Sequence, residues 1–265
     1  MNALLHISVV GDVNRPEFQY SLSKVWRSAF VSQSLSVEDF LSQNASPDVV
    51  VLLQSYPGEY SDSNMGKIIQ ANPLAATILL TSSWGEGERR TGFPIRDAIR
   101  VAWYDFPFWF EIQKTLFSRG RLSQLSLPRC ASDAQRSEMD SVFEFPVLKD
   151  CVFWILCDSA LERETLSRFY SSLQATVWTG GMHSEFPSDG QLSAPTRIVV
   201  APNCLSEDVE RKVNQLKALF LSARLYVIVN QPRIEEIKAL CKRGADEVIS
   251  PAFYSYAAMQ HQDNF

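Results

Sequence analysis

The feature that most constrains the fold of this 265-residue chain is the stretch 47–58, PDVVVLLQSYPG. A Pro-Asp pair leads into an unbroken apolar run from Val49 to Leu53, and a Tyr-Pro-Gly turn follows. A strand that is apolar at every position has both faces covered, which is typical of a parallel sheet with helices on either side. The stretch therefore predicts a central strand of an α/β domain.

The residues around this strand alternate between strand patterns and helix patterns. Apolar or alternating runs predict further strands at 4–10, 30–35, 75–81 and 103–108. Helical spacing of apolar residues and capping signals predict helices at 16–29, directly after Ser36, and at 63–71, 94–101 and 109–117. Strands and helices that alternate over about 115 residues predict a doubly wound parallel sheet.

The same order of patterns returns after a segment of different character. Residues 118–148 are rich in serine, contain Pro128 and lack a sustained apolar period, so they predict a linker. Beyond it, strands are predicted at 152–157, 176–178, 197–201, 225–229 and 247–250, and helices at 161–173, 207–221, 233–242 and 254–260. The stretch 180–195 has three glycines and two prolines, which predict a loop in place of a helix.

Landmarks recur at nearly constant offsets between the two halves. The pairs are Asp12 with Asp158, 146 residues apart, Pro47 with Pro195, 148 apart, and Pro107 with Pro251, 144 apart. Such offsets indicate two copies of one architecture. We therefore expect an α/β protein with two doubly wound parallel-sheet domains in tandem, at 1–117 and 149–265, joined by the linker 118–148.

Composition and charge narrow the class of function. The chain is 46% hydrophobic and 21% charged with a net charge of −5, so it has no basic footprint for nucleic acid. No apolar run approaches the ~18 residues that span a bilayer, and the N-terminus reads as a first strand rather than a signal peptide. Five cysteines without a CxxC spacing are expected to be free thiols in a reducing compartment. These features predict a cytoplasmic protein that binds neither nucleic acid nor membrane.

The stretch 47–58 also resembles the third strand of response-regulator receiver (CheY-like) domains. In that family the strand typically reads Pro-Asp-Leu-Val-Leu-Leu-Asp, with Pro-Gly three residues further on. The match runs without a gap from Pro47 to Gly58, and it puts Leu53 where the family carries its phosphoacceptor aspartate. The resemblance implies a flavodoxin-like fold for both halves of the chain.

The family's site implies a set of charged groups at the ends of the strands. A carboxylate pair after the first strand holds Mg²⁺, an aspartate ends the third strand, a Thr or Ser ends the fourth, and a Lys before a proline ends the fifth. Forming an aspartyl phosphate needs the carboxylate as nucleophile, and it needs cations to neutralise charge on the transferred group.

In the first domain, the resemblance leaves most of these positions without the required charge. Asp12 is the one acid after the first strand, and Leu53 cannot be a nucleophile. Thr81 matches the switch hydroxyl, and Phe106 stands in the place of the lysine, directly before Pro107. Two nearby acids, Asp48 at the opposite end of the strand and Glu59 past the turn, are disfavoured as substitutes by geometry.

The second domain shows the same losses. The stretch 195–201, PTRIVVA, aligns without a gap and puts Ala201 at the phosphoacceptor position. Asp158 is the one acid after its first strand, Asn230 takes the switch position, and Ser250 lies beside Pro251. The resemblance therefore implies two degenerate pseudo-receivers with no catalytic residue, no metal site and no cofactor.

Other candidate sites carry weaker signals. The loop 85–92, GEGERRTG, lacks the Gly-Lys-Ser/Thr ending of a phosphate-binding P-loop and is expected to be a solvated loop. His6, His183 and His261 are isolated from one another, and no Ser-His-Asp or Cys-His arrangement can be drawn.

An aromatic cluster at 103–110 is the most unusual feature of the composition. Trp109 and Phe110 form a candidate interaction surface, because aromatic anchors are common at protein–protein hot spots. The alternative is that these side chains fill the core or pack against the linker or the second domain.

Two classes of function follow. The first is a non-catalytic module that binds a protein partner, whose identity the sequence does not give, or a second copy of itself in signal transduction. The second is a small-ligand or nucleotide-binding protein or enzyme with a site between the two domains. That site would be lined by Asp12, Thr81, Asp158 and Asn230. A partner-docking segment in the linker or in the loop 180–195 is a third possibility.

Overall fold

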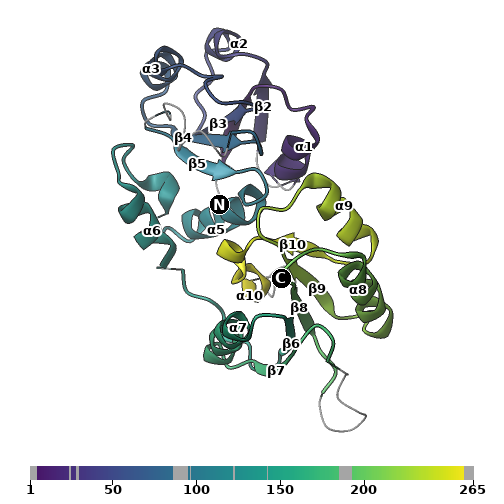
Figure 1. The fold of residues 1–265 in the computed structure, drawn as a ribbon. Coiled ribbons are helices and arrows are strands. Elements are labelled where there is room, and N and C mark those ends of the chain that lie inside the picture. The colour runs from purple at the N-terminus through teal and green to yellow at the C-terminus, as the bar shows by residue number, and fades with distance from the viewer. Residues whose placement is uncertain are drawn as a thin grey trace. The chain divides into compact units, whose positions relative to one another are not determined.

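The computed structural model describes residues 5–23, 25–27, 30–85, 95, 97–121, 123–141, 143–184 and 193–259. The chain divides into two compact units, Met1–Phe143 and Glu144–Phe265, called the first and second unit below (Figure 1). None of the helices in these ranges has the length and apolarity that crossing a membrane requires.

The first unit alternates strands and helices as the sequence predicts, except between β4 and β5, where residues 86–94 and 96 lie outside the described part of the chain. Its elements in chain order are β1 His6–Val10, α1 Pro16–Ser23, the 3₁₀ turn η1 Val25–Arg27, β2 Phe30–Ser34, α2 Val37–Ser42, β3 Val49–Gln54, α3 Asp62–Ala71, β4 Ala76–Thr81, β5 Ile99–Ala102 and α5 Phe106–Ser118. The five strands pair in the order β2-β1-β3-β4-β5, and every pair is parallel.

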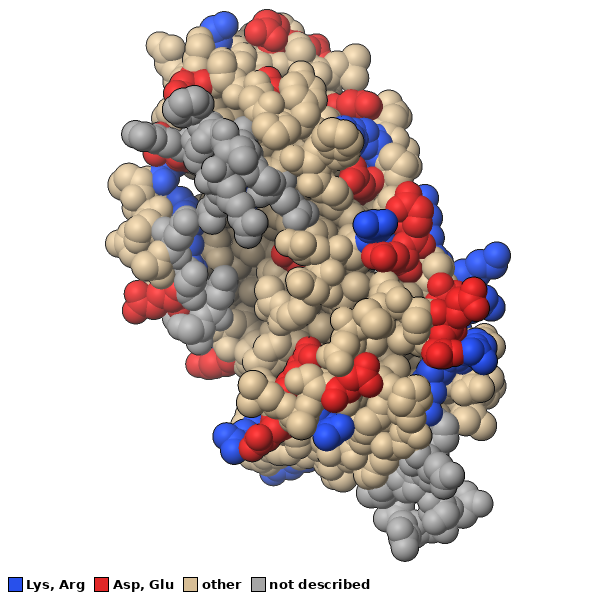
Figure 2. Space-filling view, viewed as in Figure 1, with Lys and Arg blue, Asp and Glu red and all other residues tan. Residues whose placement is uncertain are grey.

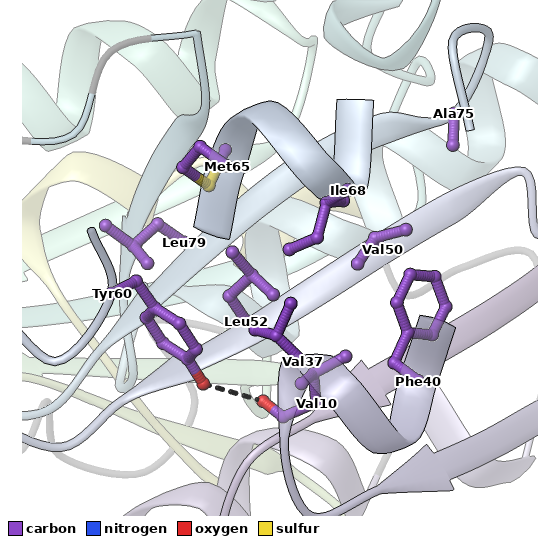
Figure 3. Close-up of a cluster of buried hydrophobic side chains, with 10 residues drawn as sticks. All are labelled: Val10, Val37, Phe40, Val50, Leu52, Tyr60, Met65, Ile68, Ala75 and Leu79. Atoms are coloured by element: carbon purple, nitrogen blue, oxygen red, sulfur yellow. Dashed lines mark hydrogen bonds between the residues drawn. The ribbon is translucent and has the colours of Figure 1, made fainter. Parts of the chain in front are cut away.

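Strand β3 lies at the centre of this sheet, as its apolar run predicts. All six of its residues are buried, and it pairs with β1 on one side and β4 on the other. Helices α2 and α3 cover one face, where Val50 and Leu52 contact Phe40 and Ile68 (Figure 3). Both helices begin at a serine cap: Ser36 Oγ accepts from the Asp39 amide, and Ser61 forms a capping box with Asn64.

The end of the first sheet differs from the prediction. The sequence predicts a helix at 94–101 and a strand at 103–108, whereas the fifth strand is Ile99–Ala102 and helix α5 begins at Phe106. Ile99 and Val101 alternate with less buried neighbours, which is a strand pattern, and they pair with β4. Pro107 lies in the first turn of α5, where its missing N–H costs nothing. The prediction was wrong because an aromatic run was read as a strand.

Part of the predicted linker packs on the first unit. It contains a 3₁₀ turn, η2 Gln124–Ser126, and helix α6 Asp133–Ser141. Arg129 Nη2 donates to the carbonyls of Asn72 and Ala75, at 2.7 and 3.1 Å. The Gln124 amide donates to Gln113 Oε1 at 2.7 Å. These bonds attach Gln124 and Arg129, both in the predicted linker, to the rest of the first unit.

The second unit repeats the topology of the first. Its elements are β6 Val152–Cys157, α7 Ala160–Ser172, β7 Thr176–Gly180, β8 Arg197–Ala201, α8 Glu207–Leu219, β9 Arg224–Ile228, α9 Ile234–Lys242, β10 Glu247–Ile249, the 3₁₀ turn η3 Pro251–Phe253 and α10 Tyr256–Met259. The parallel strands pair in the order β10-β9-β8-β6-β7, with the fully buried β8 at the centre.

Both sheets therefore have the strand order 2-1-3-4-5 when each is numbered from its own first strand, which is the flavodoxin-like order. This confirms the predicted fold class of two doubly wound α/β domains in tandem. Between β7 and β8, residues 181–184 and 193–196 contain no helix, and the remainder of the predicted loop 180–195 lies outside the described residues.

Candidate functional site

In open parallel sheets, ligands bind outside the carboxyl ends of the strands. In the first unit this edge holds Gly11 and Asp12 after β1, Leu53 in β3, Thr81 at the end of β4 and Trp103 after β5. These include most of the positions that the receiver resemblance singles out.

Leu53 and Gly11 lie against each other at this edge. Leu53 is fully buried, and Gly11 has φ +122°, a conformation that side-chain-bearing residues rarely adopt. A Cβ added to Gly11 would lie 2.9 Å from Leu53 Cβ and 3.0 Å from Tyr60 Oη. Gly11 directly precedes Asp12, so it is the place where the second acid of the family's carboxylate pair could stand. A side chain there would collide with Leu53 and Tyr60.

Tyr60 closes the edge from the loop that follows β3. Its hydroxyl lies 3.1 Å from the carbonyl oxygen of Val10 and 3.1 Å from that of Leu53, so its one proton is shared between the two acceptors. Figure 3 shows the bond to Val10. Burial, with a smaller contribution from the charge of Glu59, raises the pKa of the Tyr60 phenol well above its ordinary value. The phenol therefore stays protonated, and it ties the carboxyl ends of β1 and β3 together.

The charged groups near this edge bind one another. Arg15 Nη2 lies 3.3 Å from Glu17 Oε2, and Ser83 Oγ donates to Glu17 Oε1 at 2.9 Å. Trp103 Nε1 in turn donates to Ser83 Oγ at 3.0 Å. The network joins residues that follow β1, β4 and β5, and it leaves Glu17 bonded through both oxygens.

The two polar residues predicted for this site have partners elsewhere. Asp12 is exposed, and its Oδ1 accepts from the amide and the side chain of Asn14 at 2.9 and 3.1 Å. Thr81 is buried and its hydroxyl donates to the Val101 carbonyl at 3.3 Å. No bond between described residues joins Asp12 to Thr81. Of the disfavoured substitutes, Asp48 binds the His6 amide and Glu59 Oε2 accepts from the Ser55 amide at 2.5 Å.

Phe106 does not lie at a strand end. It occupies the first turn of α5, four residues beyond the last residue of β5, and the residue paired with Thr81 in β5 is Ala102. Phe106 is fully buried and its ring stacks on that of Trp109, with the centroids 6.1 Å apart. Its predicted placement as the lysine substitute at the end of the fifth strand is corrected accordingly.

The predicted interaction surface at Trp109 and Phe110 is also corrected. Trp109 is 4% exposed and Phe110 is 0% exposed, so neither offers a surface to a partner. The reason is that the start of α5, Phe106–Phe110, is apolar at every position, whereas the partly exposed Glu111 and Lys114 lie further along the helix. Both side chains are buried, which favours the alternative that this cluster packs inside the protein.

In the second unit, Ala201 and Cys157 lie side by side at the ends of β8 and β6. They are paired in the sheet, and both are buried. Burial and the nearby carboxylate of Glu162 raise the pKa of the Cys157 thiol to about 11. Its Sγ donates to the Ser159 carbonyl at 3.3 Å, so this thiol is a protonated interior group rather than a nucleophile.

The other predicted residues of the second unit surround an open edge. Asp158 Oδ2 accepts from the Asn203 amide at 3.1 Å, and Asn230 is exposed after β9. Ser250 is 5% exposed, and its hydroxyl has no hydrogen-bond partner in the described structure.

Two concavities open at this edge of the second unit. One, of about 510 Å³, is lined by Asp158, Met182, His183, Cys204, Ser206, Asp208, Val209, Arg211, Lys212 and Gln215. The other, of about 630 Å³, is lined by Glu162, Pro202, Asn203, Cys204, Leu205, Ile228, Val229, Asn230, Gln231, Arg233, Glu236 and Pro251. Asp158 and Asn230 thus line different concavities that meet at Cys204.

The described residues contain no group of three or more His, Cys, Asp or Glu that could hold a metal ion. On the face drawn in Figure 2, acidic and basic side chains of the described residues are interspersed and form no large field of one sign. The loop 85–92 and His261 lie outside the described residues except for Gly85.

Comparisons with known proteins give likeness of fold only. No protein-family model matches the sequence, and no curated relative matches it. A response regulator from Burkholderia pseudomallei with a phosphorylated aspartic acid is 21% identical, with a TM-score of 0.35 over 42% of this chain and 68% of that one. A structure described as a two-component system response regulator/GGDEF domain protein is 11% identical, with a TM-score of 0.37 over 96% and 94%. The E. coli RcsC C-terminus, with its phosphoreceiver domain, is 13% identical, with a TM-score of 0.31 over 92% and 86%.

TM-scores at this level carry no argument, so the fold assignment rests on the strand order of the two sheets. Sequence reasoning singled out Leu53 and Ala201, and it missed Tyr60, whose hydroxyl bonds to the ends of β1 and β3. The one signal for it is a tyrosine placed directly after the turn that follows β3, and only its hydrogen bonds reveal its role.

Proposed function

We propose that this chain is a non-catalytic tandem pseudo-receiver, which acts in the cytoplasm by binding a protein in signal transduction. The observation that supports the proposal is that Leu53 and Ala201, the aliphatic residues that the receiver resemblance puts at the phosphoacceptor positions, are both buried. Neither side chain can form an acyl phosphate, because that reaction needs a carboxylate nucleophile.

The closed edge of the first unit supports a binding role over a switching role. A receiver changes state when phosphorylation favours one of two conformations, and a ligand shifts such an equilibrium only through differential affinity. In the first unit Tyr60 and Leu53 fill the position from which that difference would come. We infer that this unit presents one constant surface to its partner.

Large apolar side chains stand exposed at the same edge and support protein binding there. Leu35, Tyr56 and Trp84 follow β2, β3 and β4 and are 78%, 55% and 74% exposed. Tryptophan and tyrosine are the residues most enriched at interface hot spots. This edge takes the place of Trp109 and Phe110 as the contact surface that we propose.

Phosphorylation is tested by incubating the intact chain with acetyl phosphate and Mg²⁺, followed by mass measurement, with an ordinary receiver domain as the positive control. We expect no phosphoryl adduct on this chain. A stoichiometric adduct on any aspartate would contradict the proposal.

Partner binding is tested by placing a photo-cross-linking residue at the exposed edge and, as the control, at the opposite edge. Trp84→p-benzoylphenylalanine is expected to give one dominant cross-linked protein in cells. The matched variant Leu74→p-benzoylphenylalanine replaces a 97% exposed side chain just before β4 and is expected to give none. Equal cross-linking at both positions would contradict a docking edge, and a cross-link to a second copy of the chain would identify a homo-oligomer.

Ligand binding is the second candidate function. A site between the domains, lined by Asp12, Thr81, Asp158 and Asn230, stays a proposal. Titration of the intact chain with nucleotides would test it. The observation that favours a ligand lies within the second unit, where the carboxyl edge is open.

A further inference from the structure

The larger of the two concavities described above is built from the loops at the carboxyl ends of β8, β9 and β10. Its volume is about 630 Å³, which is within the range of small-molecule sites. Every residue that lines it belongs to the described part of the second unit, with Glu162 contributed by α7 and Glu236 by α9. The site is therefore complete within one unit.

Several donors around this concavity have no partner within the described chain. The side chains of Asn203, Asn230 and Gln231 make no hydrogen bond there, and the Arg233 guanidinium makes no hydrogen bond or ion pair there. Of the bonds at these residues, two involve main-chain amides: Asn203 N donates to Asp158 and Arg233 N donates to Glu236. All four residues are exposed, so a cationic group and three amide groups are available to a ligand.

Carboxylates with spare oxygens line the same concavity. Glu236 Oε2 accepts from the Arg233 amide at 2.7 Å, and Glu162 Oε2 lies 3.6 Å from Cys157 Sγ. The Oε1 atom of each side chain has no partner among the described residues. The lining therefore offers anionic acceptors as well as a cationic donor.

The backbone at the rim is held in an unusual conformation. Gln231 has φ +47°, which non-glycine residues rarely adopt, and it directly precedes Pro232, a position that further restricts the backbone. Such outliers in loops persist when the surrounding structure enforces them, and they cluster at ligand-binding sites. This loop carries Asn230, Gln231 and Arg233 into the lining.

We propose that this concavity binds a small zwitterion of the amino-acid class, which carries one carboxylate and one ammonium group. Arg233 would take the carboxylate through its guanidinium fork, and Glu162 and Glu236 would accept from the ammonium group. Two carboxylates in the lining disfavour a multiply charged anion, and the exposed amides disfavour a wholly apolar ligand. This inference does not rest on the proposed role of the first unit.

The test is a titration of the full chain with each of the common free L-amino acids, followed by two-dimensional amide NMR. We expect at least one of them to give saturable shifts in residues 202–205 and 228–233. Arg233→Gln is expected to weaken that binding on the order of tenfold or more, since it removes a charged hydrogen bond. Lys238→Gln, which removes the same charge from an exposed position on α9 outside the concavity, is expected to leave it unchanged.

A second arm distinguishes the ligand class. The matching carboxylic acid without the ammonium group is expected to bind on the order of tenfold more weakly, and Glu162→Gln is expected to remove that difference in part. Binding of inorganic phosphate or of the plain acid as tightly as the amino acid would overturn the zwitterion assignment. No shift with any amino acid, or equal binding by Arg233→Gln, would overturn the site itself.

Discussion

The two units have the same strand order, but they differ at the edge where α/β proteins bind ligands. In the first unit, Tyr60 bridges β1 and β3 and Leu53 fills the space beside Gly11. In the second, the loop after β8 supplies Asn203 and Cys204 instead, and two concavities open there.

This difference shows that the loops at the carboxyl edge can change while the strands of the sheet keep their order. The central strands β3 and β8 are buried along their whole length and are apolar at all positions but one, Gln54 in β3 and Arg197 in β8, so helices can cover both faces of each sheet. The loops at the carboxyl edge differ between the two units although the strand order is the same, so this edge can be filled or open without a change of fold. Function therefore has to be argued from the edge of each unit and not from the shared topology.

The largest expected contrast comes from returning an aspartate to each unit. Leu53→Asp puts a carboxylate into a fully buried position beneath Tyr60, and we expect it to destabilise the first unit by roughly 3–5 kcal/mol. Ala201 is also buried, at 1% exposure, but its neighbours Pro202 and Asn203 line an open concavity, so we expect Ala201→Asp to cost less, about 1–3 kcal/mol.

Hydrogen exchange of peptides from each unit measures both losses separately. If Ala201→Asp destabilises its unit as much as Leu53→Asp does, the contrast between a filled and an open edge is incorrect.

The next contrast isolates the close packing at Gly11. Gly11→Ala combines a disfavoured φ with contacts to Leu53 and Tyr60, and we expect a loss of about 2–5 kcal/mol in unfolding free energy. Gly58→Ala has φ +77° but no atom within 4 Å of the new Cβ, so only the backbone cost of about 1–2 kcal/mol applies. Urea denaturation of both variants gives the difference, and equal losses would mean that the edge is not tightly packed.

A smaller effect is expected from the Tyr60 hydroxyl. Tyr60→Phe keeps the ring but removes the donor to Val10 and Leu53, which should cost about 1–2 kcal/mol. Tyr56→Phe, at a half-exposed tyrosine of the same loop, is expected to change the unfolding free energy by less than about 0.5 kcal/mol. A Tyr60→Phe variant as stable as the natural chain would show that the hydroxyl does not hold the edge closed.

The smallest effect concerns the pH dependence of Cys157. Its thiol has a folded pKa of about 11 against an ordinary value of 9.0, because burial disfavours the thiolate. The stabilisation from this shift is present below pH 9 and is lost as the pH rises from 9 towards 11. At pH 8, iodoacetamide should label the exposed Cys204 and leave Cys157 intact, and equal labelling of both would contradict its burial.

The sequence predicts the fold well because its strongest signals, the unbroken apolar runs, belong to the strands at the centre of each sheet. The apolar run at 49–53 and the run ending at Ala201 lie in the central strands of their sheets, as expected. The fifth strand was missed because Ile99–Ala102 is short, while the aromatic residues after it are more apolar and belong to a helix.

The edge is harder to predict than the sheet. The resemblance identifies Leu53 and Ala201, because each lies at or beside the last residue of a central strand. Tyr60 could not be predicted, because its role depends on a turn that brings its hydroxyl back to the ends of two strands. The openness of the second edge depends likewise on the course of three loops.

The central claim, that neither unit receives a phosphoryl group, is tested most directly by amide NMR of the intact chain with Mg²⁺ and then beryllofluoride. The account predicts that signals from residues 11–12, 53–55 and 81–83 in the first unit, and from 157–158 and 201–203 in the second, do not shift. A saturable, Mg²⁺-dependent shift around Asp12 or Asp158 would contradict it, because one of these carboxylates would then be acting as the phosphoacceptor.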